Sequence, residues 1–275
     1  MYSLAQSVEI RGAAGEPIPH PFRGLSKLEV EFRRSEFSLV AAGPGTGKSL
    51  FAAMLATWGN IPCLYFSADS SAATQTARAT AMITGDNVQG VKDALLGGDF
   101  SRYEKVTGAR WWLRYNFDAR PKPSDIERHL LCYYEIYNIN PHLIIVDNVT
   151  NVDTGNVGDA ESYTFGLEGL CEYLSEMARV TNAHVLGLHH VKGEYADGLN
   201  PIPLSGVKGQ ISRVPNLILT AHKEIDGMNS RILNFSPVKN REGFEDSSGG
   251  TFASFRLNRT NLRLEDLDDE LPAYV

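Results

Sequence analysis

Nine consecutive residues constrain the fold of this chain more than any others: Ala41-Ala42-Gly43-Pro44-Gly45-Thr46-Gly47-Lys48-Ser49. They lie between an apolar run, residues 37–40, and an amphipathic stretch, residues 50–58, so they are predicted to join a buried strand to a helix. The three glycines allow the backbone to turn tightly and to point its N–H groups at phosphate oxygens, and a helix beginning near Lys48 adds the positive end of its dipole. The segment is therefore predicted to be a phosphate-binding loop in an α/β fold.

The residue types of this loop indicate nucleotide chemistry. The Lys48 ammonium is expected to reach the β- and γ-phosphates of ATP, and the Ser49 hydroxyl to hold Mg²⁺. Ala42 stands where the pattern G-x-x-x-x-G-K-[ST] has its first glycine, so the strict form is missed by one residue. An ordinary glycine-rich turn is the alternative, but the strand and helix on either side favour phosphate binding. The residues expected to contact the nucleotide are Gly43, Pro44, Gly45, Thr46, Gly47, Lys48 and Ser49.

A second apolar run, residues 143–146, ends in an acidic residue, Asp147. A continuous apolar run is typical of a strand buried on both faces of a parallel sheet, and ligands bind at the carboxyl ends of such strands. Asp147 is therefore expected to hold Mg²⁺ through water, opposite Ser49. Any buried strand can end in Asp, which is the alternative, but the combination with Lys48 favours the magnesium role.

Other stretches predict the remaining elements. Residues 28–32 alternate in character, which predicts a short strand. Ser124 and Glu127 have the spacing of a capping box, which predicts a helix that runs to about residue 138. Further predicted strands are residues 61–67, 111–115, 184–188, 217–219, 232–235 and 251–255, the last two antiparallel to each other.

Composition limits the class of protein. With 275 residues, 43% of them hydrophobic, the chain can form one large α/β domain. Cys63, Cys132 and Cys171 are isolated, so they are expected to be buried thiols in a reducing compartment, without a structural metal. No apolar run reaches membrane-spanning length and no signal peptide is visible, so we expect a cytoplasmic protein without a membrane partner.

The formal charge of −7 is unevenly distributed. The acidic residues that follow Arg263 account for −5, so the rest of the chain carries only −2. A nearly neutral body can still line a groove with Lys and Arg, and net charge therefore does not exclude a nucleic-acid partner.

Four motifs in order carry a family resemblance: the loop Ala41-Ala42-x-Pro44-x-x-Gly47-Lys48-Ser49, the strand that ends in Asp147, His190-x-Lys192, and Lys239-Asn240-Arg241 with Gly243. In this order the chain resembles the RecA-like motor domain of replicative hexameric helicases, both the DnaB type and the related phage type. The resemblance covers about residues 22–265, and the first loop position is commonly Ala in that family.

The resemblance implies a RecA-like P-loop NTPase fold, a mostly parallel central sheet flanked by helices with an antiparallel C-terminal extension. Residues 36–264 would form the ATPase domain. Residues 1–35 would be a lead-in or an arm onto a neighbouring subunit, and residues 265–275 an acidic tail. That tail would either solubilise the protein or bind a basic replication partner.

The resemblance also implies catalytic roles. Lys48 would bind phosphate, and His190 would be a γ-phosphate sensor, with a plain histidine at a strand end as the alternative. Lys239 and Arg241 would act on the γ-phosphate held by a neighbouring subunit, Arg241 as an arginine finger. The alternative for these two is a solvated basic turn.

One residue departs from the family pattern. The glutamate that orients the attacking water follows a sequence similar to Phe-Ser-Leu-Glu in the family, and here Asp69 ends Phe66-Ser67-Ala68-Asp69. Its carboxylate lies one methylene further back, a displacement that can cost ~100-fold in rate. We expect Asp69 to act as the base, and slow hydrolysis or a purely structural role are the alternatives.

DNA contact in the resembled family comes from two loops that face a central channel, which here would be about residues 149–160 and 193–209. The residues expected to contact DNA are Lys192, Lys208 and Arg213, and an ordinary solvated loop is the alternative. These features together predict an ATP- and Mg²⁺-dependent helicase or translocase on single-stranded DNA that forms a homo-oligomeric ring such as a hexamer. The alternatives are a RecA-like switch, recombinase or loader that does not unwind DNA and, less favoured, a small-molecule kinase.

Overall fold

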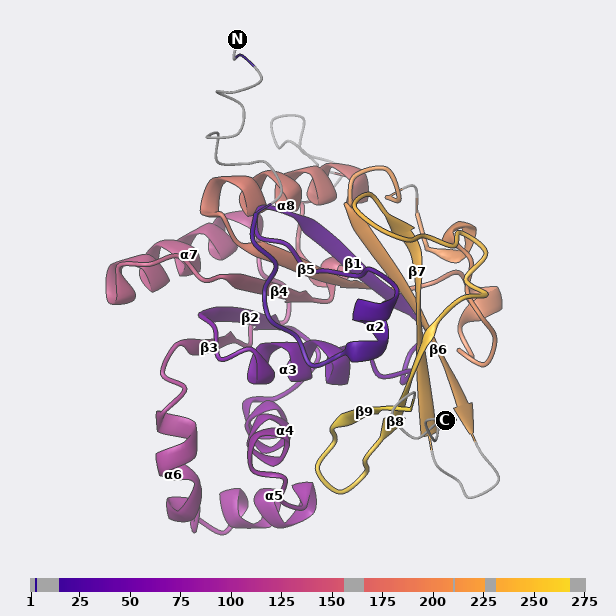
Figure 1. Ribbon diagram of the computed structural model, residues 1–275. Helices are drawn as coiled ribbons and strands as arrows, with labels where there is room; N and C mark the ends of the chain where they lie inside the picture. Colours follow the sequence, from indigo (N-terminus) through magenta and orange to yellow (C-terminus); the bar gives the residue numbers. More distant parts are fainter. Residues whose placement is uncertain (1–2, 4–14, 156–165, 210, 226–230, 268–275) are drawn as a thin grey trace.

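The computed structural model describes residues 3, 15–155, 166–209, 211–225 and 231–267 of the chain. A nine-stranded sheet with the order β3-β2-β4-β5-β1-β6-β7-β8-β9 forms its centre (Figure 1). The strands are β1 (Phe37–Ala42), β2 (Cys63–Ser67), β3 (Leu113–Asn116), β4 (Leu143–Asp147), β5 (His184–His189), β6 (Leu217–Ile225), β7 (Arg231–Asn240), β8 (Ala253–Leu257) and β9 (Leu264–Asp266). The sheet is parallel from β3 to β6 and antiparallel from β6 to β9, which confirms the predicted architecture.

Helices cover both faces of the parallel part, as Figure 1 shows. They are α2 (Arg23–Lys27), α3 (Lys48–Trp58), α4 (Ala72–Thr84), α5 (Val88–Leu96), α6 (Ser101–Gly108), α7 (Pro123–Tyr137) and α8 (Leu167–Thr181). Successive residues of β1 belong to different cores: Val40 lies in one core with Phe51 of α3, and Leu39 lies in the other with Leu174 of α8. Because neither face meets water, these strands are apolar at nearly every position.

The prediction of a strand over residues 28–32 is wrong, because this stretch is a loop. Helix α2 ends at Lys27, and Glu29 then has a φ of 54°, which an extended strand does not allow. Val30 and Phe32 are fully buried in the core. The alternation in this stretch therefore reflects two side chains that anchor a loop, and not pairing in a sheet.

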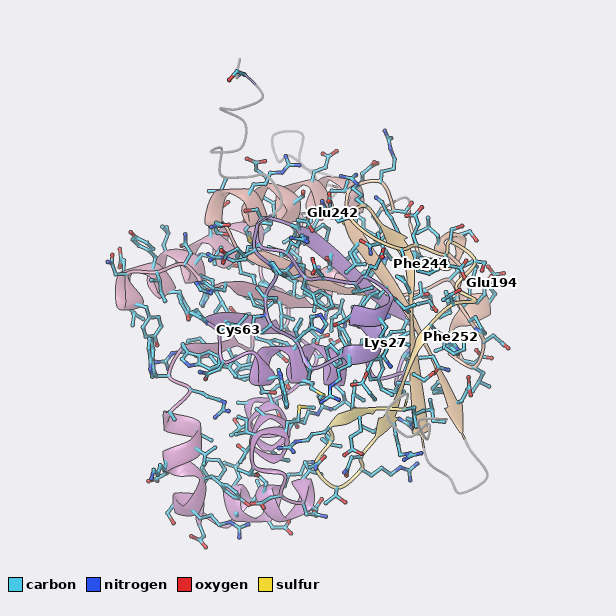
Figure 2. All side chains as sticks on the ribbon, viewed as in Figure 1. Lys27, Cys63, Glu194, Glu242, Phe244 and Phe252 are labelled. Atoms are coloured by element: carbon cyan, nitrogen blue, oxygen red, sulfur yellow. The ribbon has the colours of Figure 1, made fainter. Side chains whose placement is uncertain are left out.

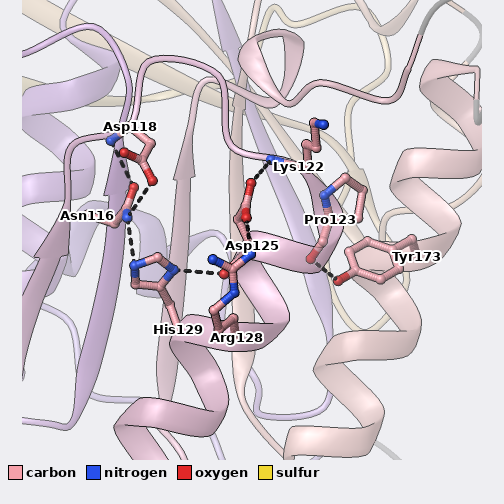
Figure 3. A network of polar contacts seen from close by, with 8 residues as sticks. All are labelled: Asn116, Asp118, Lys122, Pro123, Asp125, Arg128, His129 and Tyr173. Carbon is pink, nitrogen blue, oxygen red and sulfur yellow. Dashed lines mark hydrogen bonds and ion pairs between the residues drawn. The ribbon is translucent and has the colours of Figure 1, made fainter.

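The capping box predicted from Ser124 and Glu127 is also wrong, because the cap lies two residues earlier: Lys122 precedes the helix, which begins at Pro123. The Asp125 carboxylate accepts a hydrogen bond of 3.0 Å from the Lys122 N–H, and Pro123 needs no partner for its nitrogen (Figure 3). Glu127 instead accepts a hydrogen bond of 3.1 Å from the Tyr173 hydroxyl of α8. An acidic side chain does cap the first turn, as predicted, but it belongs to Asp125 and not to Glu127.

Two of the three cysteines are buried as expected, Cys63 within β2 (Figure 2) and Cys171 in α8. The expectation for Cys132 is wrong: it is exposed on α7, whose buried face is formed by Ile126, Leu130 and Tyr133. In the described ranges, no helix has both the length and the apolar character needed to cross a membrane.

Candidate nucleotide-binding site

The predicted nucleotide residues meet at the carboxyl edge of four adjacent parallel strands, β2, β4, β5 and β1. Asp69 follows β2, Asp147 ends β4, His190 follows β5, and the glycine-rich loop follows β1. A cavity of about 790 Å³ opens at this edge. Its lining includes these predicted residues: Pro44, Gly45, Gly47, Lys48, Ser49, Asp69 and His190. The topology thus brings together side chains that are up to 146 positions apart, counting from Pro44 to His190.

The glycine-rich loop is shaped by close contacts that only glycine tolerates. Gly47, the residue before α3, has a φ of 117°, and a Cβ there would lie 2.5 Å from a side-chain carbon of Leu233. Gly43 is packed so closely against the carbonyl of Ala196 that a Cβ would collide with it. Gly43 and Thr46 are buried and do not line the cavity. These two residues pack on the side of the loop away from the cavity, while the other predicted residues of the loop line the cavity.

Lys48 is the first residue of α3 and is 7% exposed. Its ammonium donates hydrogen bonds to the carbonyl oxygens of Ala42, at 2.8 Å, and Gly43, at 3.1 Å. Burial lowers the pKa of Lys48, and the nearby carboxylates of Asp147 and Asp69 act in the opposite direction. The ammonium is therefore held over its own loop, next to the cavity that a phosphate would enter.

Asp147 is almost completely buried, and one of its oxygens accepts a hydrogen bond of 2.9 Å from the Tyr65 hydroxyl. Its other oxygen, Oδ1, has no hydrogen-bond partner among the described residues. Burial raises the pKa of Asp147, and the nearby Ser49 and Tyr65 hydroxyls oppose that rise.

A carboxylate oxygen without a partner and a neighbouring hydroxyl are hard oxygen donors, the set that Mg²⁺ takes in a nucleotide site. The described residues contain no cluster of three or more His, Cys, Asp or Glu side chains that could hold a metal by themselves. A phosphate-bound Mg²⁺ needs only one or two protein ligands, so Asp147 and Ser49 fit that ion.

Asp69 lies at the cavity wall and is held by two amides that the sequence analysis missed. The Asn148 amide donates a hydrogen bond to one carboxylate oxygen, and the Asn151 amide donates one of 2.7 Å to the other. Both asparagines lie within four positions after Asp147, which is the only sequence signal that could have indicated them. The two hydrogen bonds fix the direction in which the Asp69 carboxylate points.

His190 also lies at the cavity wall, and the preceding His189 is fully buried. Burial and the nearby Lys48 and Lys208 charges lower the pKa of His190, while the Asp69 carboxylate acts in the opposite direction, and the net effect favours the neutral ring. A ring nitrogen of His189, Nε2, lies 2.7 Å from the carbonyl oxygen of Lys208 and donates a hydrogen bond to it. This bond ties the strand end that carries His190 to the loop that carries Lys208.

The cavity also has residues that no motif indicated. Four basic side chains, Arg78, Lys92, Arg231 and Arg259, line it together with three apolar ones, Val88, Leu257 and Leu262. They come from α4, α5, β7 and the β8–β9 region, so only the folded chain places them together. Basic groups suit the phosphates of a nucleotide, and the apolar groups suit its base.

Lys239 and Arg241 are not part of the cavity lining. They lie at the end of β7, where the Lys239 ammonium donates to the carbonyl oxygens of Ser212, at 2.7 Å, and Arg213, at 3.1 Å. The Arg241 guanidinium donates to the same Arg213 oxygen at 2.9 Å. The structure therefore separates these two cations from the phosphate loop of their own subunit.

The residues predicted to contact DNA, Lys192, Lys208 and Arg213, are exposed. The loop of residues 193–209 that carries Lys208 is described completely, whereas the first predicted loop, 149–160, lies outside the described residues beyond position 155. In the predicted acidic tail, Glu265 and Asp266 belong to β9, and residues 268–275 lie outside the described part.

Comparison with known proteins places the chain in a family. A family model described as an AAA domain matches residues 14–194. The gene 65 protein of Mycobacterium phage L5 is 42% identical over 266 residues, which cover 97% of this chain and 99% of that protein. The gene 65 protein of Mycobacterium phage D29 is 43% identical over 230 residues, 84% of this chain and 99% of that protein.

Solved structures with the same fold include helicase ATPase domains. A DnaB-like replicative helicase, studied for its interactions with primase, matches with a TM-score of 0.74 and 17% identity over 96% of this chain. This chain spans 65% of the length of that helicase. A second solved structure, described as an ATPase domain, matches with a TM-score of 0.73 and 18% identity over 96% of both chains. The chain therefore belongs to the AAA-domain family and has the RecA-like fold of DnaB-type helicase motor domains.

Proposed function

We propose that this chain is the ATP-hydrolysing motor of a helicase or translocase that moves along single-stranded DNA during replication. The observation that carries the proposal is the distribution of charged groups. Lys48, Asp69 and His190 line one cavity, while Lys239 and Arg241 lie outside it. An active site that needs all five groups is then completed only when a second copy brings its β7 end to the cavity.

In the proposed reaction, Lys48 leaves the loop carbonyls and binds the β- and γ-phosphates of ATP. Mg²⁺, held by Ser49 and by Asp147 through water, would neutralise charge on the phosphates. Asp69 orients a water molecule whose oxygen bonds to the γ-phosphorus while the β–γ bridge bond breaks, and the products are ADP and phosphate. Asp69 accepts the proton that the water loses, and neutral His190 senses whether the γ-phosphate is present.

The link to DNA rests on the loop of residues 193–209. Its Ala196 packs against Gly43, and its Gly198 packs against Thr46, so this loop contacts the phosphate loop from behind. The same loop carries Lys208 and follows Lys192, two exposed cations that would track the phosphate backbone of a strand in a ring. A change in the phosphate loop would thereby be passed to the DNA-facing loop. We further propose that residues 265–275 offer acidic groups to a replication partner.

A second function is favoured by one observation, the short Asp69 side chain whose carboxylate already accepts two hydrogen bonds from asparagine amides. A nucleotide-gated DNA-binding switch or loader would bind ATP and DNA but hydrolyse ATP slowly. ATP hydrolysis with and without single-stranded DNA, measured where light scattering also sizes the oligomers, separates the two. A motor gives DNA-stimulated hydrolysis and a ring-sized particle, and Lys48→Ala abolishes hydrolysis. A monomer with slow hydrolysis that DNA does not change would contradict the motor and support the switch.

A further inference from the structure

The turn that carries Arg241 is anchored by Asn216, the residue just before β6. The main-chain N–H of Asn216 donates a hydrogen bond of 2.9 Å to the carbonyl of Phe37 in β1, and its carbonyl accepts one of 3.1 Å from the N–H of Arg241. Its side-chain amide donates a third, of 3.2 Å, to the carboxylate of Glu36. One residue therefore joins the start of the central strand β1 to the Arg241 turn.

Glu36 is 6% exposed and has no sequence motif of its own. Burial and the neighbouring Glu242 raise its pKa to about 7, while Arg33, Arg241 and the Asn216 amide act in the opposite direction. Glu242 directly follows Arg241 in the same turn and is labelled in Figure 2. A buried carboxyl group at this place is costly, and none of the proposed catalytic steps uses it.

Strand β7 changes register just before this turn. The pairing of β6 with β7 shifts between Ile218 and Leu219, opposite Pro237, a residue that cannot donate a hydrogen bond to a sheet. After this bulge, Lys239 and Arg241 reach the carbonyl of Arg213, three residues before Asn216. The direction of both cations thus depends on the segment 212–216, which the Asn216 side chain attaches to Glu36.

We propose that Asn216 and Glu36 form a positioning pair that holds Arg241 and Lys239 at the place where they meet the nucleotide of a neighbouring subunit. The inference rests on the proposed function, because it needs hydrolysis between subunits. Neither residue lines the cavity of its own subunit. Loss of their side-chain bond would leave the subunit's own cavity intact and would misplace only the groups that it offers to its neighbour.

The test compares ATP hydrolysis by Asn216→Ala, Glu36→Ala and Glu36→Gln with the wild type. Asn216→Ala keeps the two main-chain bonds and removes only the bond to Glu36, so we expect kcat to fall about tenfold with KM for ATP unchanged. The kcat of Glu36→Ala should fall by a similar factor. Glu36→Gln keeps an oxygen acceptor for the Asn216 amide and should retain most of the activity. The control is Asn116→Ala on β3, at the other edge of the sheet, which removes an amide–carboxylate bond of 3.1 Å to Asp118 together with two further side-chain bonds, so it perturbs the fold at least as much as Asn216→Ala.

Mixed oligomers distinguish positioning from damaged folding. Asn216→Ala subunits have an intact Asp69, and Asp69→Ala subunits have an intact Arg241 turn. A mixture of the two should therefore hydrolyse ATP several-fold faster than either variant alone. Arg241→Ala mixed with Asp69→Ala is the reference. Recovery of the reference mixture without recovery of the Asn216→Ala mixture would overturn the positioning role alone. Failure of the reference mixture would overturn both this role and hydrolysis between subunits. Equal loss in Glu36→Gln and Glu36→Ala would also overturn the positioning pair.

Discussion

Gly198 and Thr46 are in contact without room for a side chain between them: a Cβ on Gly198 would lie 2.5 Å from the Thr46 hydroxyl oxygen. Gly198 also has a φ of 65°, which residues other than glycine rarely adopt. The contact joins the loop of residues 193–209 directly to the phosphate loop.

Gly198→Ala should push Thr46 and distort the phosphate loop. We expect nucleotide affinity to fall about tenfold and unfolding free energy to fall by about 1–2 kcal/mol. The measurements are titration with a fluorescent nucleotide and chemical denaturation. Gly193→Ala is the matched control, because a Cβ at Gly193 in the same loop meets nothing within 4 Å. Equal losses of nucleotide affinity and stability in the two variants would contradict a specific role for the contact between Gly198 and Thr46.

Tyr65→Phe should weaken the magnesium site, because it removes the hydroxyl that bonds to buried Asp147. We expect a stability loss of about 1–3 kcal/mol and a higher Mg²⁺ requirement for nucleotide binding. Tyr115→Phe is the control on the neighbouring strand β3, since the buried Tyr115 hydroxyl has no hydrogen-bond partner among the described residues. Denaturation and Mg²⁺ titration of both variants provide the check, and a Tyr115→Phe loss as large as that of Tyr65→Phe would refute the assignment.

Asn151→Ala should slow ATP hydrolysis without changing nucleotide binding, because it frees one oxygen of Asp69 from its 2.7 Å bond. A carboxylate held only by Asn148 points less reliably at the water, so we expect kcat to fall by about three- to tenfold. The kcat of Asp69→Ala should fall further than that of Asn151→Ala. Steady-state kinetics with ATP decide the matter, and an Asn151→Ala enzyme as fast as the wild type would show that Asp69 needs no such support.

Glu36 should make stability depend on pH. Its pKa is raised from 4.5 to about 7, so the folded chain binds this proton more tightly than the unfolded chain does. The contribution of Glu36 is therefore most favourable below pH 4.5 and is lost as the pH rises through 7. Glu36→Gln removes this dependence, and its stability relative to the wild type should rise by up to about 3 kcal/mol between pH 4.5 and about 8. Denaturation curves across that range test this, and a constant difference would contradict it.

Lys208→Ala should weaken single-stranded DNA binding by a similar factor for every sequence, because a lysine that contacts phosphate reads no bases. The slope of log affinity against log salt concentration should decrease in magnitude by about 0.7, the value for one phosphate on a single strand. Fluorescence anisotropy at several salt concentrations measures the slope. Lys105→Ala on helix α6 is an exposed control, and an unchanged slope in Lys208→Ala would remove this residue from the DNA surface.

The parts of the site that could be predicted are those whose chemistry is local in sequence. The phosphate loop combines its glycines, Lys48 and Ser49 within seven positions, and Asp147 ends an unbroken apolar run. Arg78 and Arg259 could not be found in this way, because they reach the cavity from elements far apart in the chain. The errors at residues 28–32 and at Ser124 have a common origin: burial of Val30 and capping by Asp125 depend on contacts that periodicity does not describe.

Strand β7 connects the phosphate loop of its own subunit with the turn that carries Arg241. At its first residue, the Arg231 guanidinium donates a hydrogen bond of 3.4 Å to the carbonyl of Gly45 in the phosphate loop, and its last residue, Asn240, immediately precedes Arg241. Its ten residues span about 30 Å and are stiffened by neighbours on both sides. A tilt of such a strand about its middle would move its two ends, one beside the phosphate loop and one beside Arg241, in opposite directions. In the proposed ring, this strand would begin at one nucleotide site and end at the next, so it would link successive sites mechanically.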